Sequence, residues 1–135
     1  MIVVSILSCL VAIVLNYGAV MVLPAKVSEM TLWLLIVGGI CLLLVTDALW
    51  PYLPTTNLLA GQLRETAWLL VTVALMSRGS RLMVDLQVWF HLNYNKENVH
   101  RPPLQWLLRN QETIKRAFMW FWACAPAFFL VQVWF

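Results

Sequence analysis

The fold is decided by an apolar stretch near the start of the chain, which runs from Ile2 to Leu23 and reads IVVSILSCLVAIVLNYGAVMVL. No residue in this stretch carries a charge. As a helix with a rise of about 1.5 Å per residue it would be roughly 33 Å long, which is enough to cross the hydrocarbon core of a bilayer. The stretch therefore predicts a transmembrane helix.

Three further apolar stretches have the length of a membrane span, at residues 32–53, 57–77 and 117–135. The middle one reaches an adequate length only by including Arg64 and Glu65 close to its outer end, where long side chains can extend to the headgroups. A re-entrant or interfacial segment is the alternative for that stretch, and it would leave three spans instead of four.

The composition supports the same class. Of the 135 residues, 62% are hydrophobic and 11% are charged, whereas a soluble domain carries about 25% charged residues. A soluble fold of this size could not bury so much apolar surface. We expect an all-α integral membrane protein, with one membrane domain over residues 1–135, a bundle of four (or three) transmembrane helices and a cytoplasmic amphipathic segment at residues 78–116.

The segment at residues 78–116 sets the predicted orientation. It holds seven Lys and Arg residues against three acidic residues, and such clusters stay in the cytoplasm. This predicts a multi-pass protein of the inner (plasma) membrane with both termini outside. Membrane lipid is then a predicted partner. Four cations are candidates for contact with lipid headgroups, namely Arg78, Arg81, Lys115 and Arg116.

The first span carries a stripe of small and polar residues. Its members recur at steps of three and four and therefore share one helical face. One interpretation is close packing against another helix. The other is a face that borders water when several copies assemble into a pore. The candidate residues for oligomerisation or for lining such a lumen are Ser5, Ser8, Ala12, Asn16 and Ala19.

Asp47 lies near the outer end of the second span, and Arg64 lies near the outer start of the third. We expect an intramembrane charge pair between them. An ionisable group inside a span is by default a functional candidate, so the pair has two interpretations. It either closes the outer helical hairpin as a structural contact or takes part in the passage of protons or ions.

No pattern in the sequence indicates catalysis. His91 and His100 have neither the spacing nor the neighbours of metal ligands. We therefore predict no catalytic residues, no metal and no cofactor, and the charge of +3 is too small and dispersed to indicate nucleic acid as a partner. An enzyme acting on lipid is the least favoured class because it lacks a catalytic constellation.

The first 81 residues resemble bacteriophage holins, which are small inner-membrane proteins that oligomerise and open lesions in the membrane. Three features carry the resemblance. They are the uncharged first span with its polar stripe, the turn Pro54-Thr55-Thr56-Asn57 between two further spans, and the basic end Ser77-Arg78-Gly79-Ser80-Arg81.

The resemblance implies a self-associating protein that permeabilises the inner membrane. The alternative function is a non-catalytic accessory or scaffold subunit of a larger membrane complex, such as a transporter, a secretion machine or a respiratory assembly. The abundant Trp and Phe residues fit that hypothesis equally well. The two hypotheses predict different partners, either further copies of this chain or the other subunits of such a complex.

Overall fold

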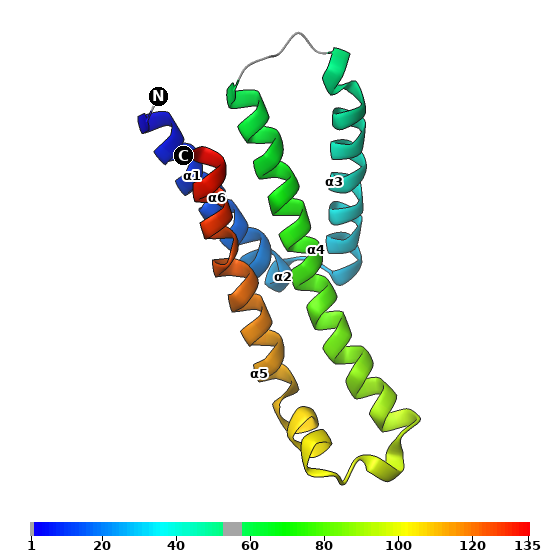
Figure 1. The fold of residues 1–135 in the computed structure, drawn as a ribbon. Helices are drawn as coiled ribbons and strands as arrows, with labels where there is room; N and C mark the ends of the chain where they lie inside the picture. Colours follow the sequence, from blue (N-terminus) through cyan, green and yellow to red (C-terminus); the bar gives the residue numbers. More distant parts are fainter. Residues whose placement is uncertain (1, 53–57) are drawn as a thin grey trace.

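The computed structural model describes residues 2–52 and 58–135, and within these ranges the chain is helical with no strand (Figure 1). Four helical stretches are long and apolar enough to cross a membrane, namely Ile2–Lys26, Glu29–Tyr52, Leu58–Asn93 and Pro102–Trp134. The predicted all-α class and the presence of four long apolar helices are confirmed. The predicted turn over residues 54–57 lies outside the described residues.

The first stretch is a helix with a local irregularity. Helix α1 (Ile2–Tyr17) continues into a π-helical turn, η1 (Gly18–Val22), and a short helix, α2 (Leu23–Lys26). Pro24 has no N–H to donate, so a regular helix could not continue through it unchanged. The wider turn precedes this position, and the Leu23 N–H bonds the Gly18 carbonyl.

Helix α3 (Glu29–Leu49) begins after Ser28, whose hydroxyl accepts a hydrogen bond from the Thr31 N–H at 3.2 Å. It ends in a 3-10 turn, η2 (Trp50–Tyr52), and packs against α4. Gly39 lies at this contact, because a Cβ there would be 3.2 Å from Cγ2 of Val71. Gly39 therefore allows the two helices to approach closely.

Helix α4 (Leu58–Asn93) has 36 residues and is about 54 Å long. The sequence prediction ended the third span at residue 77 and began a separate segment at residue 78, but the helix is continuous through this point. No proline interrupts it, and Gly79 alone costs a helix only about 1 kcal/mol. The Ser80 hydroxyl also remains within the helix, donating to the Met76 carbonyl at 2.8 Å.

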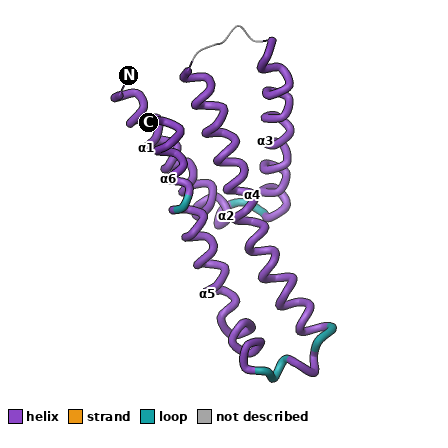
Figure 2. The backbone as a smooth tube through the Cα atoms, viewed as in Figure 1, coloured by secondary structure: helices purple, strands orange, loops and turns teal. Residues whose placement is uncertain are grey.

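The chain returns through η3 (Lys96–Asn98), α5 (Pro102–Cys124) and α6 (Pro126–Trp134). Prolines occupy the first positions of α5 and α6, where their missing N–H is tolerated. The predicted segment 78–116 therefore forms the two arms of a hairpin that continue the third and fourth apolar helices (Figure 2). We call the part of α4 after Arg78 and of α5 before Lys115, with the connection between them, the α4–α5 hairpin.

Both termini lie at one end of the molecule, where α1 runs beside α6, and the connection between α4 and α5 lies at the other end (Figure 1). Near the termini, buried Cys9, Ala12, Leu130 and Trp134 form one core cluster. A second cluster of Val20, Val73 and Ala123 joins η1, α4 and α5. The core therefore consists of thin layers between helices.

Candidate functional site

The most deeply buried polar contact joins α1 to the junction between α5 and α6. Asn16 is 2% exposed, and its Nδ2 donates to the carbonyls of Ala123 at 3.0 Å and Trp122 at 3.3 Å. Pro126 has no N–H, so it leaves the Trp122 carbonyl, four residues earlier, without its helical donor. The Asn16 amide supplies a replacement donor at the point where the helix is interrupted.

This contact bears on the two interpretations of the first-span stripe. Ala12 and Asn16 are buried inside the protomer, Ser5 and Ser8 are half-buried, and Ala19 lines a cavity. In the described structure, Ala12 and Asn16 thus belong to a packing face within the chain and do not border an open lumen. Helix α6, far away in the sequence, covers this face, which favours the packing interpretation.

A second polar cluster joins the C-terminal end of α3 to the N-terminal end of α4. Arg64 Nε lies 3.7 Å from Asp47 Oδ1, and Trp68 Nε1 donates to Asp47 Oδ2 at 2.9 Å. The Arg64 guanidinium also lies over the Trp50 ring, 4.7 Å from its centre. The geometry brings the predicted pair together. Trp68 satisfies Asp47 Oδ2, whereas Oδ1 lies beside Arg64 without a hydrogen bond within the described residues. The contact of both oxygens with protein groups favours the structural interpretation of Asp47.

At the opposite end of α3, Arg78 of α4 reaches back to Glu29. Arg78 is 5% exposed, and its Nη1 donates to Glu29 Oε1 at 2.8 Å. This guanidinium is held inside the protein beside Glu29 instead of lying free on its surface.

Lys115 is the second predicted headgroup contact that lies buried. Its Nζ is 2.5 Å from Asp85 Oδ1 and 2.8 Å from Glu112 Oε1. Burial disfavours the charge of Lys115, but the hydrogen bonds and charges of the two carboxylates outweigh burial and raise its pKa. The same hydrogen bond and the positive charge of Lys115 lower the pKa of Glu112. Of the other two predicted cations, Arg81 is half-buried and Arg116 is exposed.

A groove of mixed polar and apolar lining, which the sequence did not predict, runs between α4 and α6. Glu65, Thr72 and Gln132 are exposed along it, and its volume is about 470 Å³. Trp68 and Phe129 supply aromatic walls. We call this feature the α4–α6 groove. The spacing of seven between Glu65 and Thr72 places both on one helical face and could have indicated it, but Gln132 comes from a distant helix.

No group of three or more His, Cys, Asp or Glu residues in the described part of the chain could hold a metal ion. The His91 ring pairs locally, with its Nδ1 3.0 Å from Asn95 Nδ2. The arrangement can support packing, association and ion pairing.

No protein-family model matches the chain, and neither a curated protein nor a solved structure is significantly similar to it.

Proposed function

We propose that this chain is a non-catalytic, multi-pass protein of the inner membrane that self-associates and permeabilises the bilayer, as holins do. The α4–α6 groove is the observation that carries the proposal. Glu65, Thr72 and Gln132 open onto a side of the protomer that lipid would otherwise cover. We assign to this groove the lumen-facing role that was one of the two interpretations of the first-span stripe.

The depth of Glu65 makes exposure to lipid unfavourable. Glu65 lies 13 positions before Arg78 on α4, which is about 20 Å along the helix axis. With Arg78 at the inner boundary of a hydrocarbon core about 30 Å thick, Glu65 lies inside that core. No ion pair of Glu65 is found within residues 2–52 and 58–135.

The free-energy cost of placing Glu65 in the hydrocarbon core favours the assembly of several copies of the chain. Insertion scales give on the order of 2.5–3.5 kcal/mol for an acidic or basic side chain at the centre of a span. Several copies that turn their α4–α6 grooves toward a common aqueous space would hydrate Glu65 and remove most of this cost. The same arrangement leaves a water-filled opening at the centre of the assembly, through which the bilayer becomes permeable.

Two measurements test the proposal. Induced expression of the chain alone in a bacterium should collapse the membrane potential abruptly. In a variant with Cys9, Cys41 and Cys124 replaced by alanine, Thr72→Cys should then react with a membrane-impermeant thiol reagent. The matched Val45→Cys variant, on an exposed apolar face of α3, should stay unlabelled. An unchanged potential together with an unlabelled Thr72→Cys would overturn the proposal.

An accessory-subunit function has its own supporting observation. The α4–α5 hairpin exposes large apolar side chains beyond Arg78, with Met83 64%, Leu86 50% and Trp106 61% exposed. Exposed apolar surface of this extent is typical of a partner contact. Under this second candidate the chain expressed alone leaves the potential intact, and it co-purifies with a stoichiometric partner from its native membrane.

A further inference from the structure

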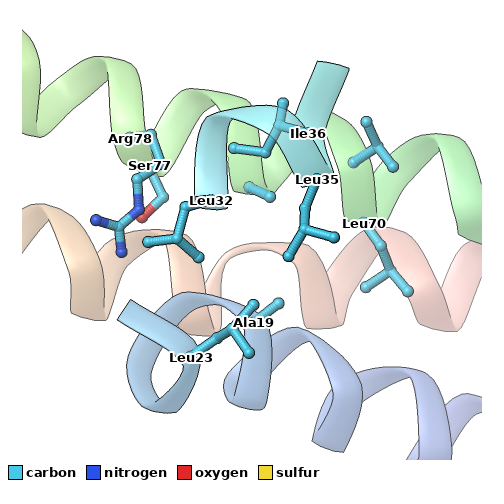
Figure 3. Close-up of a pocket in the computed structure, with 10 residues that line it drawn as sticks. Ala19, Leu23, Leu32, Leu35, Ile36, Leu70, Ser77 and Arg78 are labelled. Atoms are coloured by element: carbon cyan, nitrogen blue, oxygen red, sulfur yellow. The ribbon is translucent and has the colours of Figure 1, made fainter. Parts of the chain in front are cut away.

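A cavity of about 190 Å³ lies between the first helical stretch, α3 and α4. Its walls are apolar, and they include Leu23, Leu32 and Ile36. Figure 3 shows Ser77 and Arg78 together at one end of it, away from Leu70. The cavity therefore has an apolar body and a polar end.

The polar end contains two atoms without partners in the described structure. Ser77 is 1% exposed, and its hydroxyl makes no hydrogen bond; Arg78 Nη2 is also buried and unpaired. Leaving a buried donor unsatisfied costs about 1–3 kcal/mol, and native structures retain few such groups. Two adjacent donors at the end of one cavity indicate a missing acceptor.

The local charge favours an anionic acceptor. Arg81 is close enough to Arg78 for their charges to interact, and Glu29 is the carboxylate that opposes them. The Glu29 side chain is 61% exposed, so water screens much of its charge. The buried end of the cavity is therefore net positive.

We propose that this cavity binds one anionic phospholipid. The phosphate oxygens accept hydrogen bonds from Arg78 Nη2 and the Ser77 hydroxyl, a geometry that a guanidinium favours. The upper part of one acyl chain occupies the apolar body. An engineered apolar cavity of about 150 Å³ holds a benzene molecule, so 190 Å³ accepts several methylene groups. The remainder of the chain leaves through the open side of the cavity.

The test uses the full chain, purified in detergent and stripped of lipid. Native mass spectrometry measures the retention of phosphatidylglycerol and of phosphatidylcholine with identical acyl chains. Thermal unfolding gives the melting temperature with each lipid and with inorganic phosphate. We expect phosphatidylglycerol to be retained at least fivefold better than phosphatidylcholine and to raise the melting temperature, and inorganic phosphate to have no effect.

Two variants separate the headgroup from the acyl chain. Arg78→Gln removes the charged donor, and Ala74→Leu fills the cavity wall without changing any charge. Each should reduce the preference at least fivefold. Their matched controls, Arg109→Gln on the exposed hairpin and Ala48→Leu on the exposed side of α3, should keep it within twofold.

Four results would overturn the proposal: equal retention of both lipids, stabilisation by inorganic phosphate alone, a wild-type preference in Ala74→Leu, or a wild-type preference in folded Arg78→Gln. Far-UV circular dichroism and size-exclusion chromatography verify folding of each variant. Where Arg78→Gln does not fold, Ser77→Ala and Ala74→Leu decide the outcome, because neither removes a charge.

Discussion

The contact between Asn16 and the proline junction leads to a quantitative prediction about folding. Asn16→Ala removes the donor that serves the carbonyls of Ala123 and Trp122. A buried carbonyl left without a partner costs about 1–3 kcal/mol in soluble proteins, whereas side-chain hydrogen bonds within membrane bundles average about 0.6 and reach about 1.7 kcal/mol. Because Asn16 serves two carbonyls, we expect Asn16→Ala to lower the free energy of unfolding by about 1.5–2 kcal/mol.

A double-mutant cycle isolates the capping effect from general packing. Pro126→Ala restores an N–H that can donate to the Trp122 carbonyl, so Asn16→Ala should cost less in that background. We expect a coupling free energy of about 1 kcal/mol. Asn93→Ala is the control, since exposed Asn93 also donates to a carbonyl, that of Trp89, and its loss should cost under about 0.5 kcal/mol.

The assay is reversible unfolding in mixed detergent micelles, followed by far-UV circular dichroism and by fluorescence of the eight Trp residues. An equal cost of Asn16→Ala with and without Pro126 would refute the reasoning, because the amide would then not compensate for the missing proline N–H.

Three further predictions concern the other contacts. Gly39→Ala should destabilise the protein by about 1–3 kcal/mol because the added Cβ meets Val71. Gly38→Ala, with open space around it, should be neutral or stabilising by up to about 1 kcal/mol. Unfolding in micelles measures the free energy of unfolding of both variants. Asp47→Asn should lower the free energy of unfolding without changing ion leak in vesicles, and a changed leak with unchanged stability would contradict its structural role. The pKa of Glu112 is lowered, so its pairing with Lys115 stabilises the fold fully at pH values above the usual carboxyl pKa of 4.5. This stabilisation is lost as the pH falls through the lowered pKa. The fall in melting temperature on acidification should therefore be smaller in Glu112→Gln.

The four long apolar helices could be predicted from the sequence because their apolar character is continuous and needs no knowledge of neighbours. The Asp47–Arg64 contact was predictable for a related reason. Both residues lie near the ends of consecutive helices, and an antiparallel pair brings such ends together.

The partners of the remaining polar groups could not be predicted in this way. The carbonyls that Asn16 serves lie 106 and 107 positions away in the sequence, and Glu29 lies 49 positions from Arg78. A local sequence pattern does not indicate which distant helix packs against the face of a helix that carries such a residue. The continuity of α4 could not be predicted for a different reason, because a charged stretch is typical of the end of a span and does not show whether the helix itself continues through it.

The uninterrupted length of α4 has a mechanical consequence. In the membrane arrangement that we propose, about 30 Å of its roughly 54 Å lies in the hydrocarbon core, so about 24 Å projects from it as a stiff arm braced by α5. Because α4 is one continuous helix, a tilt of its distal tip also moves the residues along the rest of it. These include Ser77 at the cavity, Val71 at the contact with Gly39, and Glu65 in the α4–α6 groove. In that arrangement, a partner that binds the tip of the α4–α5 hairpin would also shift the half of α4 that lies in the hydrocarbon core.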